Sequence, residues 1–62
     1  MIQVTLKGNT YPIKETLKGL GFKWNQKERA WIQDLNDSEE DFAIEIANRW
    51  VSEGVYGTIK EK

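Results

Sequence analysis

The chain of 62 residues contains no cysteine, no histidine and a single proline. Without cysteine, neither a disulfide framework nor a thiolate metal site can hold a small core together. Without histidine, the chain lacks the commonest metal ligand and the commonest general base. We therefore expect no enzymatic activity, no metal site and no cofactor.

Long apolar runs are also missing. No run approaches the roughly 18 residues that a membrane span requires, and the first residues lack the basic and apolar regions of a signal peptide. The apolar fraction of 39% and the charged fraction of 31% are typical of a globular protein, and a chain this short forms one domain at most. We expect a single cytoplasmic domain over residues 1–62.

The net charge of −1 conceals two halves of opposite sign. Residues 1–30 hold six basic and two acidic side chains, whereas residues 31–62 hold three basic and eight acidic ones. Binding to a polyanion depends on the local patch more than on the total charge. The split predicts either a basic face for a polyanionic partner or two ordinary solvated surfaces.

The first thirty residues begin with a strand and a helix. Residues 2–7 alternate between apolar and polar side chains, which predicts a half-buried strand that Gly8 and Asn9 end. Thr10 can cap a helix with Pro12 in its first turn, where the missing N–H costs nothing. The apolar face of this helix would comprise Ile13, Leu17 and Leu20. Gly19 and Gly21 mark its end, one of them in the left-handed conformation.

Residues 22–32 hold two of the three tryptophans and three of the nine basic residues. If the chain reverses in the middle of this stretch, Trp24 stands opposite Trp31 in an antiparallel hairpin of strands 22–25 and 30–34. Both indoles would then share one face. No Asn-Gly or Asp-Gly pair specifies the turn type, so the hairpin is better defined than its register.

A second helix and a last strand follow. Ser38 is placed to cap this helix, whose first turn holds three carboxylates where the helix dipole favours negative charge. Its apolar face would comprise Phe42, Ala43, Ile46, Ala47 and Trp50, widened by Ile44 and Val51. Gly54 ends the helix, and residues 55–59 predict a strand that Gly57 weakens.

The order strand, helix, strand, strand, helix, strand predicts a small α+β domain. Two helices would cover one face of a four-stranded antiparallel sheet with spatial order 4-1-3-2, the split β-α-β arrangement of ferredoxin-like folds. A three-stranded sheet with an irregular C-terminal tail is the alternative.

The hairpin and the first helix supply candidate nucleic-acid-binding residues. Basic side chains neutralise phosphates, and single-stranded bases stack on exposed rings. The candidates for backbone contact are Lys14, Lys18, Lys23, Asn25, Lys27 and Arg29, and the candidates for stacking are Trp24 and Trp31. Because a domain this small also needs tryptophan in its core, we favour buried packing for both rings and contact through the basic residues.

The acidic second half supports a different function. A protein-interaction module or inhibitor would present a negative helix face to a basic partner protein. The residues of this face would be Asp34, Asp37, Glu39, Glu40, Asp41 and Glu45. Consecutive carboxylates in a first helical turn point in different directions, so we do not expect them to form a metal cage. The oligomeric state is left open by the sequence.

Residues 10–33 resemble small accessory modules attached to bacterial and phage nucleases and helicases. The shared pattern is a helix with Leu-Lys, then Gly, an aromatic, a basic residue, Trp, Asn and a short turn to a second Trp; here it covers residues 11–18, 20–25 and 27–31. The HARP domain of annealing helicases is similar in its helix followed by a charged hairpin with a late Trp. The resemblance implies a phage or mobile-element origin and DNA contact by Lys23, Asn25, Lys27 and Arg29.

Overall fold

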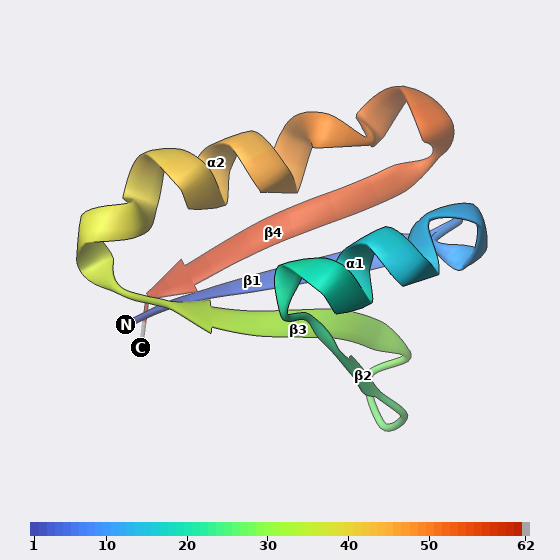
Figure 1. Cartoon of the computed structure of the whole chain (residues 1–62), viewed down its shortest axis with the longest axis horizontal. Coiled ribbons are helices and arrows are strands. Elements are labelled where there is room, and N and C mark those ends of the chain that lie inside the picture. Colours follow the sequence, from blue (N-terminus) through green and yellow to red (C-terminus); the bar gives the residue numbers. More distant parts are fainter. Residues whose placement is uncertain (62) are drawn as a thin grey trace.

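The central strand β1 (Ile2–Gly8) has one apolar and one polar side. The computed structural model describes residues 1–61, and in it β1 pairs on both flanks with antiparallel strands, β3 (Ala30–Leu35) and β4 (Val55–Glu61) (Figure 1). Every second residue of β1 is buried, as the alternation predicts: Ile2, Val4 and Leu6.

The sheet has four strands in the order β2-β3-β1-β4, because the short strand β2 (Lys23–Asn25) pairs with the outer side of β3. This is the predicted order 4-1-3-2, and all pairs are antiparallel. The three-stranded alternative is wrong, since β4 pairs with β1 along all seven of its residues.

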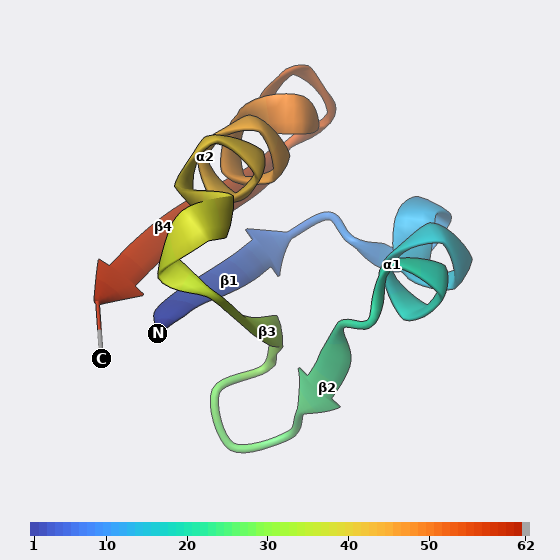
Figure 2. The same ribbon diagram turned by 60° about the vertical axis from the view of Figure 1, so that its left-hand side comes forward.

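Two helices, α1 (Lys14–Leu20) and α2 (Glu40–Arg49), cover the apolar side of the sheet (Figure 2). Short 3₁₀ turns precede α1 (Tyr11–Ile13) and flank α2 (Asp37–Glu39 and Val51–Glu53). Leu17 of α1 and Ile46 of α2 belong to one buried cluster with the inward side of β1. No helix in residues 1–61 is long and apolar enough to cross a membrane. The α+β prediction with both helices on one face is confirmed.

The end of α1 follows the prediction, but its start does not. Gly21 has a left-handed backbone with φ 98°, and the N–H of Phe22 donates to the carbonyl of Leu17 at 3.0 Å, a common helix-terminating arrangement. The side chain of Thr10 makes no capping hydrogen bond. Its hydroxyl instead accepts a buried hydrogen bond from Nε1–H of Trp31 at 3.2 Å.

The start of α2 is also capped by a residue other than the predicted one. Asn36, rather than Ser38, forms a capping box with Glu39, whose carboxylate accepts the backbone N–H of Asn36 at 3.3 Å. The cap lies earlier than predicted because a 3₁₀ turn precedes the α-helix. The capping prediction was therefore right in kind and wrong in position.

The apolar face of α2 is narrower than its sequence suggests. The buried residues are Ala43, Ile46, Ala47 and Trp50. The three remaining apolar residues are exposed: Phe42, Ile44 and Val51. The helix lies close to β4, because a Cβ atom at Gly57 would collide with the backbone of Ala47. Gly57 therefore allows close packing of α2 on the sheet instead of weakening the last strand.

Candidate nucleic-acid interface

The β2–β3 hairpin has the predicted register, with Trp24 opposite Trp31 and Asn25 opposite Ala30. A four-residue turn, residues 26–29, joins the strands. Within the turn, the backbone N–H of Glu28 donates to Oδ1 of Asn25 at 3.0 Å. This side-chain hydrogen bond stabilises the reversal without an Asn-Gly pair.

The two tryptophans of the hairpin have different environments. Trp31 is 7% exposed and hydrogen-bonded to Thr10, so its ring is not accessible to a base. Trp24 is 46% exposed and meets Trp31 edge-on, with ring centroids 5.5 Å apart and an interplanar angle of 64°. Its Nε1–H donates to Oε1 of Gln26 at 3.1 Å. Stacking by Trp31 is therefore ruled out in this structure, and the burial expected of both rings fails for Trp24.

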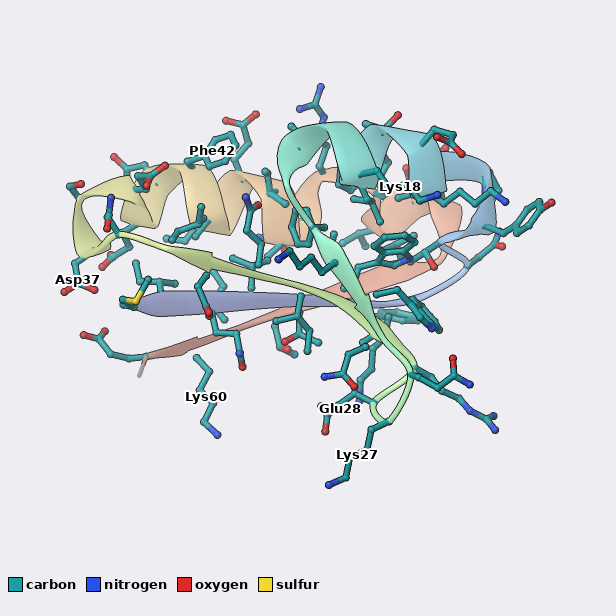
Figure 3. All side chains as sticks on the ribbon, turned by 60° about the horizontal axis from the view of Figure 1, so that its bottom comes forward. Lys18, Lys27, Glu28, Asp37, Phe42 and Lys60 are labelled. Carbon is teal, nitrogen blue, oxygen red and sulfur yellow. The ribbon has the colours of Figure 1, made fainter. Side chains whose placement is uncertain are left out.

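Three exposed cations surround the hairpin turn. Lys23 lies on β2, Lys27 at the tip and Arg29 at the end of the turn. Figure 3 shows Lys27 extending from the tip, on the side of the sheet away from the helices. Within residues 1–61, none of these three side chains forms an ion pair. The backbone of Arg29 is left-handed, with φ 52°, the only such non-glycine residue in this range.

Further cations lie on the open face of the sheet, which is the face away from the helices. Lys7 is opposite Tyr56, and Lys60 is opposite Gln3, across the β1–β4 ladder. Neither lysine nor Tyr56 was among the predicted site residues. The period-two alternation of β1 could have placed Lys7 there, and extending the last strand to residue 61 would have placed Lys60.

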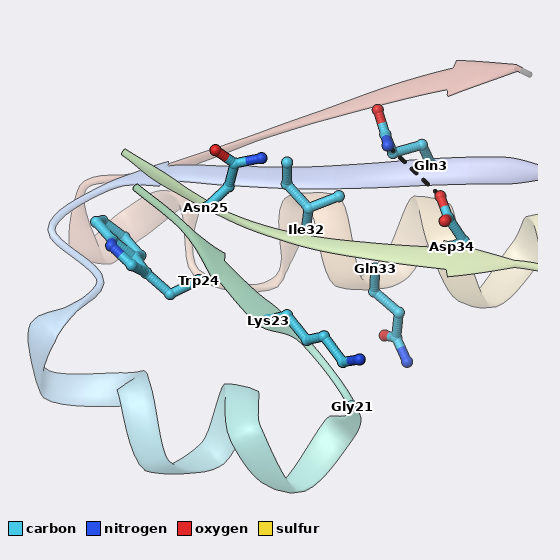
Figure 4. A pocket seen from close by; sticks show the side chains of 8 residues that line it. All are labelled: Gln3, Gly21, Lys23, Trp24, Asn25, Ile32, Gln33 and Asp34. Atoms are coloured by element: carbon cyan, nitrogen blue, oxygen red, sulfur yellow. Dashed lines mark hydrogen bonds between the residues drawn. The ribbon is translucent and has the colours of Figure 1, made fainter. Parts of the chain in front are cut away.

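A shallow hollow of about 430 Å³ lies where β2, β3 and β1 meet (Figure 4). Its lining residues are Gln3, Gly21, Lys23, Trp24, Asn25, Ile32, Gln33 and Asp34. Gln3 Nε2 donates to Asp34 Oδ1 at 3.5 Å, and Gln33 Nε2 donates to the carbonyl of Leu20 at 2.8 Å, joining β3 to the end of α1. Lys23 and Asn25 thus share one surface with amide groups and a carboxylate.

Lys14 and Lys18 do not join that surface. Both lie on α1, and Figure 3 shows Lys18 on the helix side of the sheet. Lys14 Nζ lies 4.2 Å from the centroid of the Tyr11 ring, and Lys18 Nζ lies 3.9 Å from a carboxylate oxygen of Glu15. The structure therefore divides the predicted backbone contacts between two faces, with the hairpin residues separate from those of α1.

The acidic candidates are divided as well. Asp34 lies on the open sheet face, Asp37 pairs with the N-terminal amine of Met1 at 3.2 Å, and Glu39 belongs to the capping box. The acidic residues exposed on α2 itself are Glu40, Asp41 and Glu45. Within residues 1–61, no group of three or more acidic side chains is arranged to hold a metal ion.

The chain matches no family model, no curated protein and no solved structure. Function must therefore be inferred from the charges, the exposed rings and the geometry of the chain itself.

Proposed function

We propose that the protein is a small nucleic-acid-binding accessory module, encoded by a phage or mobile element, that contacts the phosphate backbone through the β2–β3 hairpin. The observation that carries this proposal is the exposure of Lys23, Lys27 and Arg29 around one turn, without ion pairs in the described part of the chain. Such cations can replace the counterions of a phosphate backbone without first breaking a protein contact.

The backbone of Arg29 supports a role for its side chain. A left-handed conformation costs a residue with a Cβ atom about 1–2 kcal/mol, whereas glycine adopts it freely. The chain nevertheless has an arginine there, with φ 52°. Strained backbone positions gather at binding sites, and the strain here is consistent with selection for the guanidinium rather than for the turn.

Contact through the hairpin agrees better with the aromatic residues than contact through the middle of the sheet. RNA-binding sheets of the RRM type stack bases on aromatic side chains of the sheet surface. The open face of the two central strands carries none, since its residues are Gln3, Thr5, Lys7, Ala30, Ile32 and Asp34. Trp24, beside the basic turn, is an exposed ring that could stack on a single-stranded base there.

Fluorescence anisotropy with single- and double-stranded oligonucleotides at two salt concentrations tests the proposal. We expect affinity to fall steeply with salt, and the double variant Lys27→Glu/Arg29→Glu to lose at least about tenfold in affinity and to lower the salt slope by about 2. The matched control Lys14→Glu/Lys18→Glu makes the same charge change on α1 and should have a much smaller effect, because screening confines such effects to about 10 Å at 0.1 M salt.

Two results would contradict this proposal. Absence of binding by the wild type at about 50 mM salt would remove it, since electrostatic binding is strongest at low salt. Equal losses in the two double variants would show that binding follows total charge rather than the hairpin. Circular dichroism of all variants confirms that each is folded.

A second function, a protein-interaction module or inhibitor, is favoured by an exposed aromatic residue on the acidic helix. Phe42 is 38% exposed beside Asp41 and three residues before Glu45 on α2. An exposed ring among carboxylates suits a basic partner with an apolar contact at its centre. A pull-down from host lysate tests this: loss of a specific partner on Glu40→Lys/Glu45→Lys supports it, and an unchanged partner contradicts it.

A further inference from the structure

Strand β4 forms one edge of the sheet (Figure 2), and half of its backbone groups point outward. Beside the pair Gly8–Val55, the N–H of Asn9 donates to the carbonyl of Gly54 at 3.1 Å. This geometry makes Gly8–Val55 a non-hydrogen-bonded pair. By alternation, the even-numbered residues of β4 direct N–H and C=O toward β1. The residues that direct both groups away from the sheet are Gly57, Ile59 and Glu61.

Most of this edge lacks the features that prevent another strand from pairing, since its two charged residues, Lys60 and Glu61, lie together at one end. Within residues 55–61 there is no proline, and the register with β1 runs without a bulge. Proteins commonly protect edge strands with one of these features or with very short strands. The opposite edge, β2, has only three residues. β4, with seven, is therefore the edge at which a strand can add.

Exposed apolar side chains lie along the same edge. Ile59 belongs to β4 and is exposed on its helix side. Ala47 of α2 packs against Gly57 of β4. Ile44, three residues before Ala47 on α2, lies on the same side of the helix and is exposed, and Val51, in the 3₁₀ turn that follows α2, is exposed as well. A strand added at β4 would cover part of this apolar surface.

We propose that the β4 edge binds β4 of a second copy of the chain, antiparallel and centred on Thr58, so that the two sheets become continuous. In this register all seven residues pair, and the outward backbone groups of Gly57 face those of Ile59 in the second copy. Thr58 lies opposite Thr58 of the second copy, as a non-hydrogen-bonded pair.

The charges of β4 select this arrangement. Lys60 and Glu61 lie at one end of the strand. An in-register parallel pair would therefore place Lys60 opposite Lys60 and Glu61 opposite Glu61 of the second copy, and like charges directly opposite are destabilising. The antiparallel pair instead places Lys60 opposite Tyr56, whose ring is 67% exposed on the open face. An ammonium group over a tyrosine ring is attractive. The strand is therefore complementary to itself in one orientation.

Cysteine cross-linking tests the register. The chain has no cysteine, so Thr58→Cys introduces a single thiol. Opposite residues of a non-hydrogen-bonded pair have Cα atoms about 4.5 Å apart, within the disulfide range of about 4.4–6.8 Å. We expect mild oxidation to convert this variant into a covalent dimer, while Thr16→Cys, at an exposed site on α1, stays largely monomeric. Equal cross-linking of the two variants would overturn the proposal.

Charged residues introduced at position 58 test the same interface without covalent chemistry. Size-exclusion chromatography with light scattering, from about 1 μM to about 1 mM protein, should show a concentration-dependent wild-type dimer. Thr58→Lys and Thr58→Glu should each be monomeric because of like-charge repulsion, and their mixture should dimerise again. Thr16→Lys should dimerise like the wild type.

Three outcomes would contradict the dimer. If the wild type is a monomer at the highest concentration, the β4 edge does not bind a second copy and is either exposed to solvent or bound by a strand of another protein. A dimer that survives Thr58→Lys, or a mixture of the two variants that stays monomeric, would place the interface elsewhere. None of these measurements involves nucleic acid. β4 and the hairpin lie at opposite edges of the sheet, so the dimer and the proposed function can fail independently.

Discussion

The two edges of the sheet differ in how they are held. At the β4 edge, seven residues pair with the central strand and α2 lies directly on the backbone at Gly57. At the β2 edge, three residues pair with β3, and an exposed turn with three cations follows. The comparison shows that long backbone pairing and close contact with a helix occur at one edge, and a short strand with three exposed cations at the other.

A small chain has a physical reason to separate these roles. A domain of about 60 residues buries only about 60% of the surface of its unfolded chain, so it has few side chains to spare for packing both edges. The hairpin is therefore anchored mainly through β3, where Trp31 is buried and Gln33 bonds to the end of α1. β2 adds little burial, since Lys23 and Trp24 are exposed.

Truncating each of the two hairpin tryptophans should give the largest effect on stability, and the two losses should differ. Trp31→Ala removes a buried ring and leaves the hydroxyl of Thr10 without its indole donor, so we expect a loss of about 3–5 kcal/mol in the free energy of unfolding. Trp24→Ala loses one edge-on ring contact and partial burial, about 1–2 kcal/mol. Urea unfolding followed by far-UV circular dichroism measures both without relying on tryptophan fluorescence. Equal losses would contradict the anchoring of the hairpin through β3.

A pair of glycine substitutions compares the β4 edge with α1. Gly57→Ala should destabilise the protein by about 1–3 kcal/mol, because the new Cβ atom would collide with the backbone of Ala47 and push α2 from the sheet. Gly19→Ala, at a helical position with no atom within 4 Å of the added Cβ, should stabilise by about 0.5–1 kcal/mol. Thermal unfolding checks the opposite signs. A neutral Gly57→Ala would show that α2 is not held tightly against β4.

Patterns of local origin predicted most of the fold. The alternation of residues 2–7, the apolar stripe on α1 and a left-handed glycine at the end of α1 each appear as expected. Gly54, expected to end the second helix, follows a 3₁₀ turn instead, because α2 already ends at Arg49. The hairpin also appears as predicted, and its register is the one expected if the chain reverses in the middle of residues 22–32, with the two tryptophans opposite each other. These features depend on neighbours in the chain or across one turn.

Features that depend on distant partners were the ones missed. Thr10 does not cap its helix because the indole of Trp31, 21 residues away, takes its hydroxyl. Phe42 and Ile44 are exposed because α2 meets the sheet along a narrow stripe, which the sequence period alone does not show. At the site, the lysines of α1 were candidates for backbone contact together with those of the hairpin, whereas packing places the helix on the other side of the sheet.

Arg29 allows a last, finer test of the contrast between the β4 edge, which packs against α2, and the β2 edge with its exposed cations. Arg29→Gly relieves a left-handed backbone but also adds freedom to the unfolded chain, so we expect a net stabilisation of only about 0.5–1 kcal/mol. In a domain of this size, each kcal/mol of stabilisation raises Tm by about 4–8 °C.

If the guanidinium contacts phosphate, the same substitution should weaken oligonucleotide binding and lower the salt slope by about 1. Arg29→Lys, the control, keeps the charge and the strain, and should change both quantities less. A Gly variant that is more stable and binds equally well would show that the strained arginine has no part in recognition, because its conformational cost would then bring no binding.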